Sequence, residues 1–180
     1  MAVSVVAAPA GARPSPPDGI GGWEVGFSTG GVVDADRDDR ALAVDVWYPV
    51  DAADATTGPA VLDLFVAGYE LDHALADPDP SSAGPFPLVV FSHGSGGFRA
   101  QSWTLLESWA SQGFVVVAPD HAGNTALDGF YGTLDPFPVV AANRPRDISF
   151  VIDEVTEWTN DPASRFAGLV DLDNIGVAGH

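Results

Sequence analysis

Cysteine is absent from the 180 residues of this chain, and lysine is absent as well. Without cysteine the chain can form no disulfide, no thiolate metal site and no cysteine nucleophile. All seven basic residues are arginines, and 25 acidic residues oppose them, which gives a formal net charge of −18. Such a surface repels nucleic-acid phosphates and anionic membranes, so we expect neither as a partner. The simplest interpretation of the charge is solubility.

Long apolar runs are missing too, since none approaches the roughly 20 residues that a transmembrane helix needs. Residues 2–12 resemble the end of a secretory signal with a small-residue cleavage site, but no basic residue precedes them. A signal-peptide remnant and a plain disordered tail both fit, so the sequence leaves a secreted and a cytoplasmic location open. We predict a flexible tail over residues 1–22 and one domain over residues 23–180, where the 46% apolar content supports a single core.

The order of predicted elements indicates an α/β fold. Two alternating segments, Trp23 to Phe27 and Ala41 to Tyr48, flank a polar turn and predict an antiparallel hairpin. Three continuous apolar runs then predict strands buried on both faces of a mostly parallel sheet. These runs are Leu88 to Phe91, Phe114 to Ala118 and Asn174 to Ala178.

Helical spacing fills the gaps between these strands. One helix is predicted over Gln101 to Gln112, with Gly113 ending it, and another opens at Asn143 with Pro145 in its first turn. A further helix is favoured near Val61 to Leu75, within a long irregular stretch. The hairpin is therefore followed by β-α-β-α-β, with helices covering both faces of the sheet.

The last residues of the chain form a short strand that runs into Gly179-His180. This is the first half of the pattern G-x-S-x-G, in which a strand turns sharply into a helix and exposes a serine nucleophile above the sheet. The serine is expected immediately after His180, with the rest of the triad beyond it. We therefore expect the chain as given to lack the nucleophile and to be inactive.

A glycine-rich loop, Ser92 to Gly97, follows the first buried strand. Sites in such sheets form outside the carboxyl ends of the strands, so this loop lies beside the elbow. We assign the backbone N–H of Ser95 as an oxyanion-hole donor and Gly94 to the same loop. A tight turn without a catalytic role is the alternative. Ser95 fits poorly as the nucleophile, because His93 stands where the G-x-S-x-G frame requires glycine.

The remaining candidate residues point to structure rather than chemistry. His93 fits a structural histidine bonded to backbone, and His121 fits either a pocket wall or a surface loop. Asp34, Asp36, Asp38 and Asp45 match four positions of a calcium-loop frame. The glycine that this frame needs at its sixth position is Asp39, which favours a solvated hairpin turn. No spacing indicates zinc, so we expect neither a metal nor a cofactor.

Together these patterns resemble the platelet-activating-factor acetylhydrolase branch of the α/β-hydrolases, which also includes polyester hydrolases and dienelactone-hydrolase-like esterases. Five blocks between Trp23 and His180 support the resemblance: residues 44–49 (VDVWYP), 87–99 (PLVVFSHGSGGFR), 112–121 (QGFVVVAPDH), 144–148 (RPRDI) and 175–180 (IGVAGH).

The resemblance implies a serine ester hydrolase whose acyl-enzyme forms on short-acyl lipids, small esters or polyesters. It implies that Gly94-Ser95 is the oxyanion loop and that the residue after His180 is the nucleophile. A non-catalytic binding module and an amidase of the same fold are the alternatives. The oligomeric state is not predicted.

Overall fold

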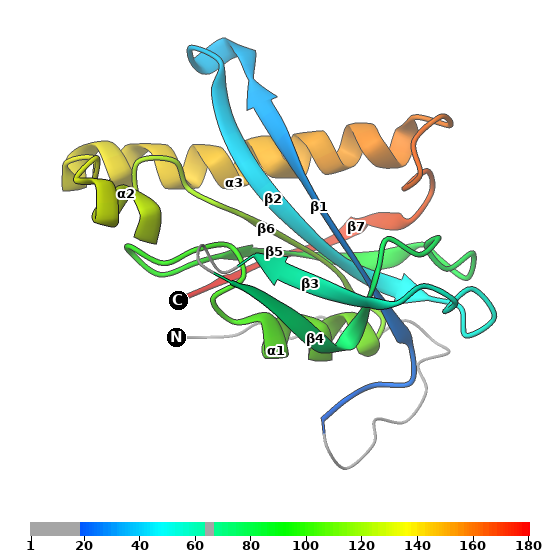
Figure 1. Cartoon of the computed structure of the whole chain (residues 1–180). Coiled ribbons are helices and arrows are strands. Elements are labelled where there is room, and N and C mark those ends of the chain that lie inside the picture. The colour runs from blue at the N-terminus through cyan, green and yellow to red at the C-terminus, as the bar shows by residue number, and fades with distance from the viewer. Residues whose placement is uncertain (1–18, 64–66) are drawn as a thin grey trace.

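The computed structural model describes residues 19–63 and 67–180 as one mixed seven-stranded sheet with helices on both faces (Figure 1). Its elements, in chain order, are β1 (Glu24–Asp34), η1 (Ala35–Arg37), β2 (Arg40–Val50), β3 (Pro59–Asp63), β4 (Gly68–Ala76), β5 (Phe86–Ser92), α1 (Trp103–Ser111), β6 (Val115–Pro119), α2 (Ala126–Tyr131), α3 (Phe137–Asn160) and β7 (Val170–Gly179).

The strands lie in the order β3-β4-β1-β2-β6-β5-β7. The segment β6-β5-β7 is parallel, as predicted, and β2 joins it by antiparallel pairing with β6. The predicted α/β class is confirmed, but the sheet is mixed rather than mostly parallel. The reason is that the two hairpins, β1-β2 and β3-β4, together make up the other side of the sheet.

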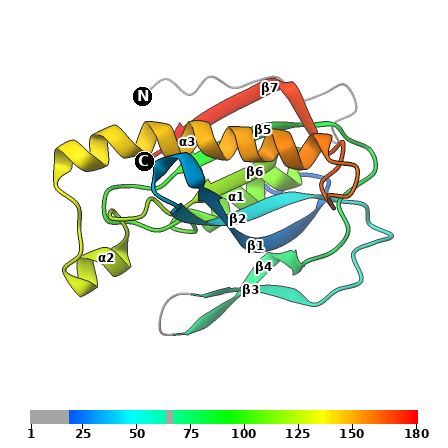
Figure 2. The ribbon, with the colours of Figure 1, turned by 90° about the horizontal axis from the view of Figure 1, so that it is seen from above.

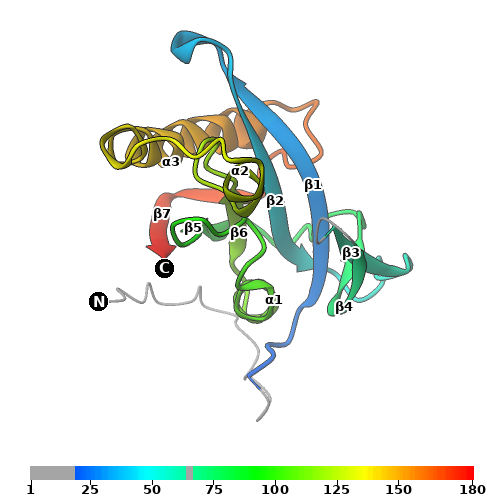
Figure 3. The ribbon, with the colours of Figure 1, turned by 60° about the vertical axis from the view of Figure 1, so that its left-hand side comes forward.

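Helix α3 lies across one face of the sheet, and α1 covers the other (Figures 2 and 3). Side chains alternate between the two resulting cores, because successive residues of a strand point to opposite faces. In β6, Val117 belongs to the core under α3, whereas Val116 belongs to the core against α1. Both are fully buried. This double burial explains why the strand is a continuous apolar run in the sequence.

The predicted hairpin is longer than its sequence pattern suggested. Pairing between β1 and β2 runs from Glu24 opposite Val50 to Asp34 opposite Arg40. At the turn, the Asp34 side chain accepts a hydrogen bond from the backbone N–H of Asp36 and caps η1. Asp45, the fourth member of the calcium-loop frame, lies in β2 and is buried. The hairpin-turn interpretation is confirmed.

The helix favoured near Val61 to Leu75 is wrong, because β3 and β4 occupy this stretch. Burial in β3 alternates, with Ala60 and Leu62 inside and Val61 exposed, which is the period of a strand. Next to it, β4 pairs in parallel with the edge of β1. Partners far away in the sequence therefore decide the structure of this segment.

The prediction that the last helix starts at Asn143 is also wrong. Helix α3 begins at Phe137, with Pro138 in its first turn, and Pro145 lies inside the helix. Proline is common in the first turn of a helix, because the N–H that it lacks has no partner there. The sequence pattern therefore places the helix start close to Pro145, which the structure shows inside the helix. Before α3, Thr125 and Asp128 form a capping box that starts α2. That pattern, T-x-x-D, was the overlooked signal.

Residues 1–18 of the predicted tail lie outside the described residues. Gly21 is buried, and its N–H donates to the Ser111 hydroxyl at the end of α1 (2.6 Å). Among the described residues, no helix combines the length and the apolar character that crossing a membrane requires.

Candidate active site

The glycine-rich loop lies where the sequence predicted it, at the carboxyl ends of the parallel strands. Ser92, the last residue of β5, is paired with Gly179 at the end of β7. The strand ends approach so closely that a Cβ on Gly179 would lie 2.7 Å from the Ser92 carbonyl oxygen. The His180 ring lies beside Gly94, where a Cβ would be 2.7 Å from its Nδ1. The end of β7 and the predicted oxyanion loop are therefore neighbours.

The backbone amide of Ser95 is distinct from the other amides of this loop. It makes no hydrogen bond with any of the described residues, and Ser95 itself is exposed. The neighbouring amides are all occupied: Gly94 donates to Gln101 Oε1 (3.0 Å), Gly96 to the Asn124 carbonyl (3.2 Å) and Gly97 to the Gly94 carbonyl (2.9 Å). One N–H in a fixed loop is thus left for a ligand.

Glycine is required in the loop for two separate reasons. Gly96 has φ of +69°, a conformation that L residues with a side chain rarely adopt. At Gly97, a Cβ would lie 2.0 Å from Gln101 Oε1 and 2.9 Å from the Gly94 carbonyl oxygen. The loop therefore keeps its shape only with glycine at these two positions.

The hydroxyl of Ser95 has no base. Its Oγ accepts a hydrogen bond from Asn124 Nδ2 (3.3 Å) and, within the part of the chain that the structure describes, bonds to no histidine or carboxylate. A serine nucleophile needs a base within hydrogen-bond reach. The geometry of this side chain gives Ser95 no such activation.

His93 is a structural histidine, as predicted. It is fully buried, its Nδ1 lies 2.7 Å from the Gly94 carbonyl oxygen, and its Nε2 accepts the backbone N–H of His121 (3.1 Å). These partners require the neutral ring with its proton on Nδ1. Burial lowers the pKa of His93 to about 4, although the hydrogen bond to Gly94 opposes the shift.

His121 forms the centre of a hydrogen-bonded chain that the sequence did not reveal. Its Nε2 lies 2.9 Å from Ser92 Oγ, and its Nδ1 lies 2.9 Å from an oxygen of Asp147 on α3. The ring is 0% exposed, so the surface-loop alternative is wrong. In the tautomer whose Nδ1–H donates to the carboxylate, Nε2 accepts the Ser92 hydroxyl.

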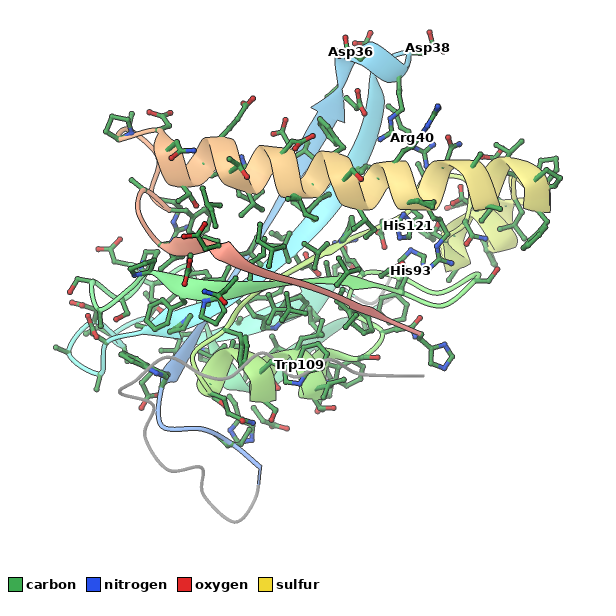
Figure 4. The ribbon with its side chains drawn as sticks, turned by 180° about the vertical axis from the view of Figure 1, so that it is seen from behind. Asp36, Asp38, Arg40, His93, Trp109 and His121 are labelled. Atoms are coloured by element: carbon green, nitrogen blue, oxygen red, sulfur yellow. The ribbon has the colours of Figure 1, made fainter. Side chains whose placement is uncertain are left out.

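Two arginines from the β1-β2 hairpin complete the surroundings of Asp147. Arg40 donates to both carboxylate oxygens (2.8 and 2.9 Å), and Arg37 donates to one of them (2.8 Å). Burial acts to raise the pKa of Asp147, but hydrogen bonds from Arg40, His121 and Arg37 hold it well below its usual range. Figure 4 shows Arg40 between the hairpin tip and the two histidines. Asp147 is therefore ionised.

Arg144, one turn before Asp147 on α3, connects the loops that follow β5 and β6. Its Nη2 donates to the His93 carbonyl and to Ser92 Oγ (2.8 Å), and its Nη1 donates to Asn124 Oδ1 (3.2 Å). Burial lowers its pKa, and the nearby Asp147 opposes that shift. The guanidinium remains charged, as arginine does in proteins.

Sequence reasoning missed the residues that support the loop, although two signals were present. Arg144 and Asp147 are spaced i, i+3 and so lie on one face of a helix. His121 directly follows a buried strand on the side of the sheet where sites form. The pairing of the hairpin arginines with Asp147 left no local signal, because 110 residues separate Arg37 from it.

Other features lie away from this loop. A groove of about 410 Å³ runs between the hairpin tip and α3, and no residue of the glycine-rich loop lines it. Within residues 19–63 and 67–180, no group of three or more His, Cys, Asp or Glu side chains is placed to hold a metal ion.

Comparison with protein families gives a match over residues 61–136. The matching family is described as platelet-activating factor acetylhydrolase, isoform II. The matched stretch contains β5, the glycine-rich loop, β6 and α2. This match agrees with the resemblance that the sequence blocks indicated.

Among solved structures, the chain is similar to a ferulic acid esterase from Streptomyces cinnamoneus. The two share 33% sequence identity with a TM-score of 0.67. The alignment covers 87% of this chain and 52% of the esterase, so the chain spans about half the length of that enzyme. Both comparisons support an α/β-hydrolase-like branch, and the matched proteins are named as an acetylhydrolase and an esterase.

Proposed function

We propose that this chain is part of a serine carboxylic-ester hydrolase and that the Ser95 N–H is one donor of its oxyanion hole. The observation that supports the proposal is the free, exposed amide of Ser95 beside the end of β7, in a loop whose neighbouring amides are occupied. The proposed substrates are esters with short acyl groups, carried on lipids, small alcohols or polyesters.

In this proposal, the residue after His180 is the serine nucleophile. Its hydroxyl oxygen attacks the ester carbonyl, and its proton passes to a histidine base. The carbonyl oxygen becomes an oxyanion, which accepts hydrogen bonds from Ser95 N–H and from the amide after the nucleophile. The alcohol leaves with a proton from the histidine, and water then releases the acid from the acyl-enzyme. An amide fixed before the reaction stabilises the developing charge without reorganisation.

The test separates the side chain of Ser95 from its backbone in the full-length protein. Ser95→Ala keeps the N–H and should change kcat little. Ser95→Pro removes it and should lower kcat by about 100-fold or more, since one oxyanion donor is worth ~3–4 kcal/mol. Activity on a short-chain p-nitrophenyl ester is measured beside thermal unfolding, which identifies a variant that has lost its fold. Equal activity of two folded variants contradicts the assignment.

A second measurement addresses residues 1–180 alone. We expect them to hydrolyse the same ester no faster than the buffer does, because the Ser95 hydroxyl bonds only to Asn124 within the described residues. Turnover that Ser95→Ala abolishes would restore Ser95 as the nucleophile and refute its role as an amide donor.

A further inference from the structure

We propose that Arg144 is the positioning residue of the oxyanion loop, because it fixes the backbone on both sides of the Ser95 amide. The inference rests on the proposed function. Arg144 does not contact the reacting atoms in this proposal and acts through the loop alone. Its guanidinium reaches from α3 to the loops after β5 and β6. Arg99 joins the same two loops at a different point, through its ion pair with Asp120.

Before Ser95, Arg144 holds the chain directly. Its Nη2 donates to the His93 carbonyl, two residues before the amide, and to the Ser92 hydroxyl. The same peptide group is held on its other side, because the N–H of Gly94 donates to the Gln101 side chain. The orientation of the loop as it approaches Ser95 is therefore set by one side chain from α3 and one from the turn before α1.

After Ser95, Arg144 acts through Asn124. Nη1 of Arg144 donates to Asn124 Oδ1, which fixes the orientation of that amide group. The opposite end of the group, Nδ2, donates to Ser95 Oγ, and the Asn124 carbonyl accepts the Gly96 N–H. The residue after the free amide is thus held by the Asn124 backbone, and the long contact at Ser95 Oγ (3.3 Å) is the weaker of the two ties.

A lysine cannot replace this arginine. Three acceptors on two loops are met by the fixed fork of a planar guanidinium, whereas an ammonium group is a single point of charge. Ser92 also accepts from Arg144 while its own proton is directed to His121, whose far side is fixed by Asp147. Arg144 is therefore held in place by the buried chain that begins at Asp147.

The same chain has the order of a catalytic Ser–His–Asp triad, so Ser92 itself is the competing candidate. Ser92 lies within the last pair of the ladder between β5 and β7, not on a strand-to-helix turn. Its carbonyl accepts the His180 N–H, and its Oγ is already occupied by Arg144 and His121. This environment favours a structural hydroxyl over a nucleophile that must accept an acyl group.

The experiment compares Arg144→Ala and Arg144→Lys in the full-length protein, with Arg146→Ala as the matched control. Arg146 lies on the same helix and is exposed. We expect kcat to fall about 10- to 100-fold in both Arg144 variants with KM changed less than about 3-fold, since a loop displaced by ~1 Å loses this much. Added methylguanidinium should restore part of the kcat of Arg144→Ala. Arg146→Ala should match the wild type.

A second readout does not depend on turnover. The ¹H–¹⁵N resonance of Ser95 should shift in both Arg144 variants and stay in place in Arg146→Ala. If the wild type hydrolyses no ester, the proposed function fails, and this resonance still tests the positioning role. If Arg144→Ala does not fold, Arg144→Lys provides both readouts.

Two results would overturn the proposal. One is a folded Arg144 variant with wild-type kcat and an unmoved Ser95 resonance. The other is a fluorophosphonate probe that labels Ser92, as found by mass spectrometry of the digested protein, because that would make Ser92 a nucleophile and Arg144 its direct partner.

Discussion

Two carboxylates are buried on opposite faces of the sheet, and their surroundings differ sharply. Asp147 on α3 is 0% exposed, and Glu107 on α1 is 2% exposed. Asp147 receives hydrogen bonds from two arginines and His121. Glu107 has no hydrogen-bond partner at its Oε1 within the described residues. Burial is nearly equal, so the partners account for the difference between the two sites.

The pKa values of these two groups move in opposite directions. Burial raises the pKa of Glu107, and the His73 backbone N–H opposes this only in part. At Asp147 the same effect of burial is exceeded by hydrogen bonds from Arg40, His121 and Arg37, so its pKa falls. Hydrogen-bond donors around a buried carboxylate therefore decide in which direction its pKa moves. Asp147, the carboxylate whose pKa falls, supports the loop beside the proposed active site.

The largest expected effect comes from removing the charge of Asp147. Asp147→Asn leaves two arginines facing an uncharged group, and breaking a buried pair costs about 3 kcal/mol or more. Asp153→Asn, an exposed change on the same helix, should alter the free energy of unfolding by less than about 0.5 kcal/mol. Urea unfolding near neutral pH measures both. A cost at Asp147 no larger than that at Asp153 would show that the arginine cluster contributes nothing to stability.

His93 extends the comparison to a buried base that has no ion pair among the described residues. Its pKa is about 4, below the usual 6.5, so between these values the native state binds fewer protons than the unfolded state. Its contribution to stability is complete above about pH 6.5 and is lost as the pH falls toward about 4. The loss amounts to about 3 kcal/mol at a shift of this size.

His93→Gln tests this pH dependence. Glutamine does not titrate, and its Oε1 can accept the His121 N–H that His93 Nε2 accepts. We expect unfolding free energies at about pH 7 and about pH 4.5 to differ less in the variant than in the wild type. Equal pH dependence in both proteins would mean that His93 is not the group responsible.

Features set by neighbours in the sequence could be predicted, whereas features set by distant partners, such as those of Asp147, could not. Continuous apolar runs identified β5 and β6, because burial on both faces leaves no room for polar residues in a strand. The glycines of the loop located the candidate site, because close approach and positive φ demand them at Gly96 and Gly97. Both are local constraints, visible within a few residues.

Long-range pairing left no such trace. Nothing local distinguishes Asp147 from Glu107, and only the folded chain brings Arg37 and Arg40 to the first of them. Arg144 and Asp147 both lie inside the helix predicted from Asn143, but nothing near them in the sequence showed which groups they contact. The supporting network was therefore missed for the same reason that β3 and β4 were, since partners far along the chain decide both.

The smallest expected change in the free energy of unfolding is a gain in stability, at Glu107. Because folding raises the pKa of Glu107, the native state holds this proton more tightly than the unfolded state does. Stability therefore falls as the pH rises through the pKa of the folded protein. Near neutral pH, Glu107→Gln should therefore stabilise the protein by up to about 1 kcal/mol. The gain should vanish below about pH 4.5, where the wild-type carboxyl is protonated in both states.

Exposed Glu157→Gln is the control and should show no such dependence. Urea unfolding across this pH range decides the matter, and a destabilised Glu107→Gln near neutral pH would mean that this carboxylate has a partner comparable to those of Asp147.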